Sequence, residues 1–139
     1  MSNHLLLPNP TQIQLMGVYD RGVPNSERIV VHATEPTQMG EYGLLVGIQQ
    51  EPNVATPIPD VFFWFGTGIV KANSYLLVYT GSGEGLVTTL QGSGDPAYIV
   101  HWGRRSTLFA DSRVVPILIH IDGVGVGRSP ENMPQLASS

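Results

Sequence analysis

The sequence predicts a single all-β domain, an antiparallel β-sandwich of about seven to eight strands. Two apolar blocks, Val61–Val70 and Tyr75–Gly81, are rich in aromatic and β-branched residues and flank the polar step Lys71–Ser74. The 16 glycines and 11 prolines favour many turns, and no segment carries an apolar helical period over three turns. A small β-barrel is the alternative architecture.

The first three predicted strands are separated by Gly-, Pro- and Asn-containing turns. Ile13–Tyr19 has Ile13, Leu15 and Val18 as apolar residues, Glu27–Ala33 is centred on the β-branched run Ile29–Val31, and Tyr42–Ile48 is almost wholly apolar. This spacing of strands and turns is typical of a sandwich or a barrel.

The later strands follow the same rule. The aromatic run Val61–Phe65, then Tyr75–Thr80, Tyr98–Trp102 and Val114–Asp122 are predicted as strands, and a short extra strand could lie at Val124–Val126. Pro116 lacks an N–H, so it places its strand at a sheet edge or a bulge. The best helical candidate, Ser106–Asp111, is long enough for one turn at most.

The aromatic residues are predicted to form the centre of the core. Strand alternation points one set inward: Phe63, Phe65 and Tyr75, or, if the register slips by one residue, Phe62, Trp64 and Leu76. Because the apolar run is continuous, we expect both faces of this strand to be covered.

The length and the termini predict one folded unit. We expect a flexible arm at residues 1–10, the β-sandwich at residues 11–127, and a flexible tail at residues 128–139, because both ends are rich in Pro, Asn and Ser. The first residues lack the basic start of a signal peptide, and no stretch is long and apolar enough to span a membrane.

Charge and cysteine content restrict the classes of partner and cofactor. The chain has 7 Lys and Arg against 11 Asp and Glu, with a net charge of −4, which argues against nucleic acid as a main partner. The absence of cysteine excludes disulfides, thiolate zinc sites and cysteine nucleophiles, and it favours a reducing compartment, the cytoplasm. No cofactor is predicted.

One group of residues suggests hydrolase chemistry. His101 could act as a base, Ser106 or Ser112 as the nucleophile, and Asp111 as the residue that orients the histidine. No G-x-S-x-G nucleophile elbow is present. The alternative interpretation places His101 at the rim of the sandwich, beside a buried Trp102.

One pair of residues suggests a metal site. His120 and Asp122 share one strand face with Leu118, opposite Ile117 and Ile119, and could hold a metal ion. His4, His32 and His101 are scattered along the sequence, so the spacing supplies no third ligand, and the alternative is a half-solvated strand face.

A cluster of arginines suggests an anion or partner patch. Its members are Arg104, Arg105 and Arg113. The alternative is a solvated loop in which they pair with Asp111 or Glu84, an arrangement that contributes little to stability.

The order of these features resembles the lamin-tail domain, an immunoglobulin-like β-sandwich. Three segments carry the resemblance, and they are Arg28–Val31 with Met39–Val46, Phe63–Phe65 with Gly68–Tyr79, and His101–Gly103 with Val114–Gly127. Asn73 stands where the family usually has a turn glycine, and asparagine tolerates the left-handed backbone. The resemblance implies a structural or interaction module and supplies no catalytic residues.

The leading hypothesis is therefore a non-enzymatic structural or protein-interaction domain that acts by self-association or by binding another protein. Charged residues make up 13% of the chain, whereas a well-solvated surface carries about 25–35%. Some apolar surface should then be covered, and symmetric self-association is the commonest way to cover it. The alternatives are the small hydrolase and a β-barrel that binds a small ligand among its aromatics.

Overall fold

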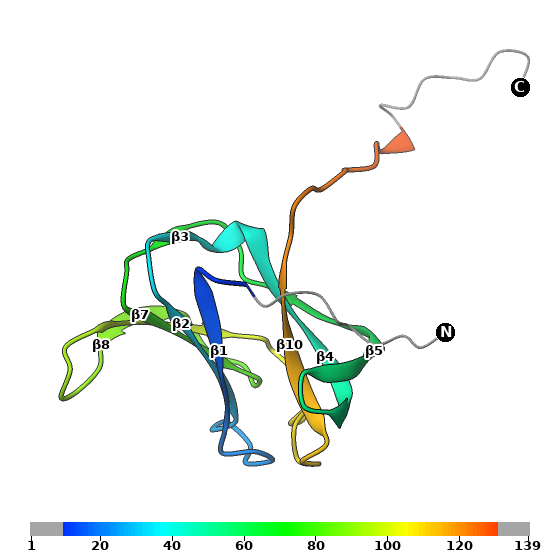
Figure 1. Cartoon of the computed structure of the whole chain (residues 1–139), viewed down its shortest axis with the longest axis horizontal. Coiled ribbons are helices and arrows are strands. Elements are labelled where there is room, and N and C mark those ends of the chain that lie inside the picture. Colours follow the sequence, from blue (N-terminus) through cyan, green and yellow to red (C-terminus); the bar gives the residue numbers. More distant parts are fainter. Residues whose placement is uncertain (1–9, 131–139) are drawn as a thin grey trace, which may run out of the picture.

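The computed structural model describes residues 10–130, and this part of the chain is all-β (Figure 1). Its strands form several sheets that enclose a core without closing into a barrel, so the sandwich-like prediction is confirmed and the barrel alternative is wrong. The strands are β1 (Ile13–Tyr19), β2 (Arg28–Ala33), β3 (Thr37–Gln38), β4 (Tyr42–Glu51), β5 (Val54–Trp64), β6 (Ile69–Val70), β7 (Ser74–Tyr79), β8 (Leu86–Thr89), β9 (Pro96–His101) and β10 (Val114–His120).

The larger sheet has five strands in the order β1-β2-β7-β9-β8. β9 lies between β7 and β8 and runs parallel to β7, with Tyr75 opposite Ala97 and Tyr79 opposite His101. This pair departs from the predicted antiparallel arrangement, because the chain passes outward to β8 before it returns through a hairpin to β9.

The second sheet has three strands in the order β10-β4-β5, and a two-stranded pair joins β3 to β6. Both neighbours of β4 are antiparallel to it. Pro116 lies on β10, which is an edge strand, as a residue without an N–H requires. A 3₁₀ turn at Met39–Glu41 leads into β4.

The seven predicted strands are all present, and β5 differs most from its prediction. It begins at Val54 rather than Val61, because the segment with Pro57 and Pro59 still pairs with β4. The short strands β3, β6 and β8 were not predicted. The suggested strand at Val124–Val126 is absent, and the side chains of Val124 and Val126 are 77% and 87% exposed.

The centre of the core is mostly aliphatic, and its two buried aromatic residues are Tyr42 and Phe109. Ile13 and Ile29 from the larger sheet and Leu44 from the second sheet are fully buried, together with Phe109 from the loop before β10. Phe109 lies in the segment predicted as a single helical turn, which forms an irregular loop instead.

The predicted aromatic core is therefore wrong in part. Phe63 and Phe65 pack against the core while remaining partly exposed, and of the alternative set only Leu76 is buried. Phe62 and Trp64 are 46% and 49% exposed, so the expectation that both faces of β5 are covered is wrong.

A buried carboxylate fixes the loop that carries Phe109. Glu27 is 1% exposed. Its two oxygens accept hydrogen bonds from the backbone N–H groups of Gly22, Leu108 and Phe109 and from the Thr80 hydroxyl, at 2.7 to 3.0 Å. A buried carboxylate needs partners of this kind, and here they tie three separate segments of the chain to the start of β2.

The last strand ends at His120, and residues 122–130 are exposed and lead away from the sheets (Figure 1). The predicted arm at residues 1–10 and tail at residues 128–139 lie almost wholly outside the described residues. No helix within residues 10–130 is long and apolar enough to cross a membrane.

Candidate functional site

The outer surface of the three-stranded sheet is apolar and faces away from the core. In the registers of this sheet, Leu45 lies opposite Phe62 on one side and Ile117 on the other. Residues on the outer side alternate with the core residues Leu44 and Leu118, as the strand period requires. We call this surface the apolar face, and its members are Leu45, Phe62, Trp64, Val115, Ile117 and Ile119.

Two glycines on the middle strand keep the apolar face flat. A Cβ atom at Gly43 would lie 2.7 Å from the Phe62 ring, and one at Gly47 would lie 2.7 Å from Cδ1 of Ile117. The neighbouring side chains therefore lie down over the glycines. Trp64 is held in place by a hydrogen bond from its Nε1 to the Gly40 carbonyl at 2.8 Å.

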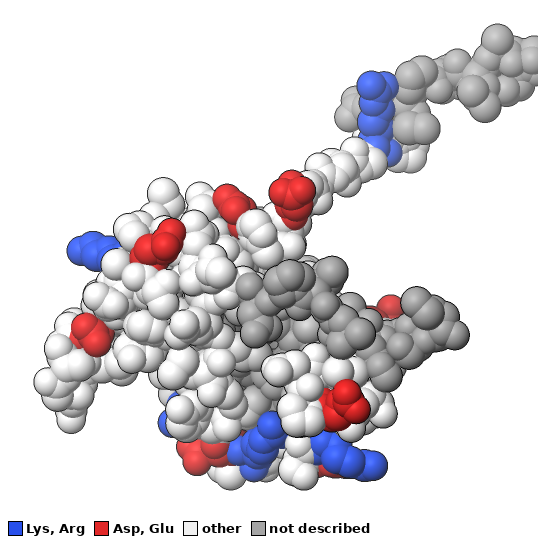
Figure 2. All heavy atoms as spheres, viewed as in Figure 1, with Lys and Arg blue, Asp and Glu red and all other residues white. Residues whose placement is uncertain are grey.

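Charged residues are few within the strands of this sheet: Asp60 lies on β5, two residues before Phe62, and Glu51 ends β4. β10 contains no Asp, Glu, Lys or Arg. Figure 2 shows charged side chains of both signs at the lower end of the molecule, where Figure 1 places the loops that join β1 to β2 and lead into β10. An uncharged, contiguous apolar surface is typical of a protein-binding site.

The apolar face could not be placed from the sequence. In Phe62–Phe65 every residue is aromatic, so alternation cannot show which side faces the core. The signal that could have shown it is β10, where Ile117 and Ile119 lie opposite Leu118 and His120. The side with Leu118 packs on the core, so the half-solvated side of this strand is the isoleucine side, the reverse of the expectation.

The residues of the hydrolase hypothesis are not joined into a catalytic arrangement. His101 stacks on Tyr79 with ring centroids 5.4 Å apart, and its Nδ1 is buried without a hydrogen-bond partner among the described residues. A Cβ atom at Gly83 would collide with the same ring. Ser106 and Ser112 are exposed, and no hydrogen bond within residues 10–130 links either of them to His101.

His120, one of the two residues of the metal hypothesis, makes contacts with other side chains instead. His120 Nε2 lies 3.0 Å from Oε1 of Glu41, and the His120 ring packs on Tyr42. Burial raises the pKa of the Tyr42 phenol, and the neighbouring Glu41 adds to this. Asp122 lies beyond the end of β10, and no group of three or more metal-binding side chains occurs in the described part of the chain.

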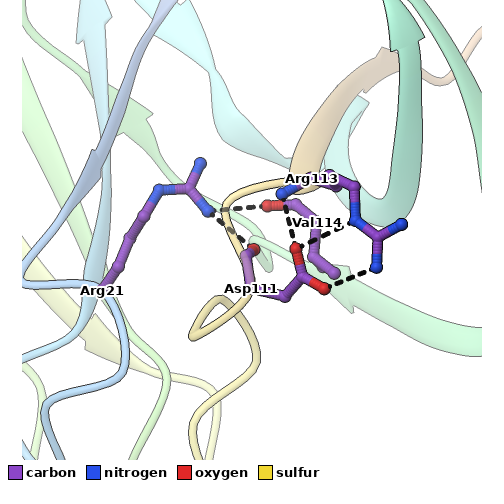
Figure 3. A network of polar contacts seen from close by, with 4 residues as sticks. All are labelled: Arg21, Asp111, Arg113 and Val114. Atoms are coloured by element: carbon purple, nitrogen blue, oxygen red, sulfur yellow. Dashed lines mark hydrogen bonds and ion pairs between the residues drawn. The ribbon is translucent and has the colours of Figure 1, made fainter.

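The predicted arginine patch does not form as a unit. Arg113 pairs with Asp111 at 2.9 Å, as the alternative interpretation expected, whereas Arg104 and Arg105 have no ion pair among residues 10–130. Arg21, which was not predicted, donates to the carbonyls of Asp111 and Val114 (Figure 3) and also to that of Phe109. These arginines hold the loop before β10.

The Asp111 carboxylate provides a pH-dependent test of this loop. Hydrogen bonds from the side chain and backbone of Arg113 lower its pKa from 3.8 to about 2. A group with a lowered folded-state pKa stabilises the fold above its unfolded pKa and loses this contribution as pH falls through the folded value. We expect a carboxyl titration by NMR to place Asp111 near 2 and Arg113→Gln to return it toward 3.8. A wild-type value near 4 would contradict the pair.

A small hollow beside the larger sheet is the candidate cavity for the ligand-binding hypothesis. It lies among Ile13, Val31, Met39 and Leu76, and its cavity volume is about 0 Å³, too little to admit a water molecule. Pockets for small molecules usually have about 300–1,000 Å³. This hollow is therefore too small for such a ligand.

The fold thus defines the class as an all-β, sandwich-like domain with an exposed apolar sheet face. Comparisons with protein-family models, with curated proteins and with solved structures find no match to this chain. The resemblance to the lamin-tail domain stays a prediction.

Proposed function

We propose that this protein is a non-enzymatic interaction domain that associates with a second copy of itself through the apolar face. The observation that carries the proposal is the exposure of Phe62 and Trp64, which are 46% and 49% exposed on the same sheet as β10, a strand without charged residues. Large exposed aromatics on a flat, uncharged surface are characteristic of interface centres.

A second copy of this chain is the occupant that we propose. Arg113 precedes β10, whereas Glu41 and Asp122 lie at the opposite end of the same sheet. A two-fold axis across the strands, in the plane of the interface, would bring the Arg113 end of one copy over the acidic end of the other. Arg113 is already paired with Asp111 at its own end, so the contact would come from the apolar residues, and each face would cover its equivalent, as in an isologous dimer.

The apolar face is a better basis for function than the hydrolase residues. His101 is packed under Gly83 and against Tyr79, and Asp111 is engaged by Arg113. The proposal assigns these residues to the fold and assigns no catalytic step to them. Since the chain contains no cysteine, we place the protein in a reducing compartment such as the cytoplasm.

A pair of matched lysine variants tests the proposal. Phe62→Lys introduces a charge into the apolar face, and we expect it to lower the mass measured by light scattering below the wild-type value, because the contact through this face is lost. Ile69→Lys is the control, because Ile69 is 70% exposed on β6 and lies outside the apolar face. It should leave the mass at the wild-type value. Equal masses for the wild type and Phe62→Lys would overturn the proposal.

A further inference from the structure

The strand β8 is an exposed edge at the end of the five-stranded sheet. All four of its residues are exposed, and Leu86 and Val87 are 52% and 67% exposed. It pairs with β9 on one side, in a regular register from Leu86 opposite Ile99 to Thr89 opposite Pro96. Within the described residues no strand lies on its other side.

The other edges of the two main sheets carry features that prevent pairing. β1 has a bulge between Leu15 and Gly17, and β10 contains Pro116. β5 contains two prolines and has Asp60 in the left-handed region, with φ of 64°. Bulges and prolines are the usual protection of a sheet edge. β8 has no proline, no charged residue and no bulge.

The hairpin shows which backbone groups of β8 are free. Leu90 N–H donates to the Asp95 carbonyl at 2.8 Å, so these two residues form a hydrogen-bonded pair at the loop end of the hairpin. Hydrogen-bonded and non-hydrogen-bonded pairs alternate along an antiparallel ladder. Thr88 and Leu86 therefore bond to β9, whereas Val87 and Thr89 direct their N–H and C=O groups toward the open edge.

We propose that β8 pairs with β8 of a second copy, antiparallel and centred on Thr88. In this register Val87 of each copy lies opposite Thr89 of the other, and the two pairs exchange about four hydrogen bonds. The two five-stranded sheets become one continuous sheet. This contact is separate from the apolar face and does not depend on it.

The sequence around β8 is complementary to itself in this register. Leu86 lies opposite Leu90, so apolar side chains meet, and Thr88 lies opposite its own copy. Glu84 lies opposite Gly92, so the carboxylate nearest the strand does not meet another. Cross-strand pairs of β-branched and apolar residues stabilise a sheet, whereas facing like charges destabilise it.

A single-cysteine experiment tests the register, because the chain has no cysteine of its own. Facing residues in a non-hydrogen-bonded pair have Cα atoms about 4.5 Å apart, within the range of a disulfide. We expect Thr88→Cys to form a covalent dimer under mild oxidation. Val87→Cys is the control, because its two copies would lie about 7–8 Å apart on the diagonal, and we expect at least about tenfold less dimer.

A charge exchange provides the second measurement. Thr88→Lys and Thr88→Glu each place two like charges face to face, and we expect neither variant alone to pair through β8, whereas an equal mixture should form a heterodimer. Both experiments are repeated in the Phe62→Lys background, so that failure of the apolar-face proposal leaves them readable. Equal crosslinking of Thr88→Cys and Val87→Cys, or no heterodimer in the mixture, would overturn the edge proposal.

Discussion

Replacing Glu27 with alanine is expected to lower the free energy of unfolding by about 3–5 kcal/mol. The carboxylate is 1% exposed and accepts four hydrogen bonds. Its removal leaves the N–H groups of Leu108 and Phe109 without an acceptor, and a buried unsatisfied donor costs about 1–3 kcal/mol. The loss is a large part of the about 5–15 kcal/mol that stabilises a domain.

Urea unfolding followed by tryptophan fluorescence measures this effect. Glu51→Ala is the matched control, because Glu51 is an exposed glutamate at the end of β4. It should change the stability by no more than about 0.5 kcal/mol. A loss below about 1 kcal/mol for Glu27→Ala would contradict the role of this carboxylate as the anchor of the loop.

Phe109→Ala is expected to destabilise the fold by about 3–5 kcal/mol, because truncating a fully buried phenylalanine leaves a cavity. Phe62→Ala should cost much less in the monomer, since its ring is 46% exposed on the outer side of β5. Thermal unfolding of both variants, at a concentration low enough to prevent association, compares them directly. Similar losses for the two variants would show that the core is not centred on Phe109.

The strands with alternating or β-branched patterns could be predicted from the sequence. β10 is rich in β-branched residues, and β1 begins and ends where its apolar residues indicate. The left-handed turn residue Asn73, with φ of 62°, was also recognised from its residue type. Elements of this kind can be predicted from their own residues alone.

The elements that depend on long-range contacts could not be predicted. β3 and β6 have two residues each and exist because they pair with one another. Phe109 stands in an irregular loop, and its burial depends on Glu27, which lies 82 residues away in the sequence. A charged residue near a turn gives no sign that it will be buried.

The apolar face could not be predicted from the sequence for a related reason. A run such as Val61–Phe65 is apolar at every position, so its pattern is equally compatible with both faces buried and with one face exposed. Only the position of β5 at the edge of a three-stranded sheet shows that Phe62 and Trp64 point away from the core. The low charge of the chain indicated an exposed apolar surface but could not place it.

The central claim is that this domain associates with itself, and sedimentation of the wild-type chain over a range of concentrations tests it most directly. At tens of micromolar the account predicts a species of at least twice the 15.0 kDa of one chain, with an interface above about 1,000 Å². Dilution should return the monomer. A mass of 15.0 kDa at every concentration would contradict the account.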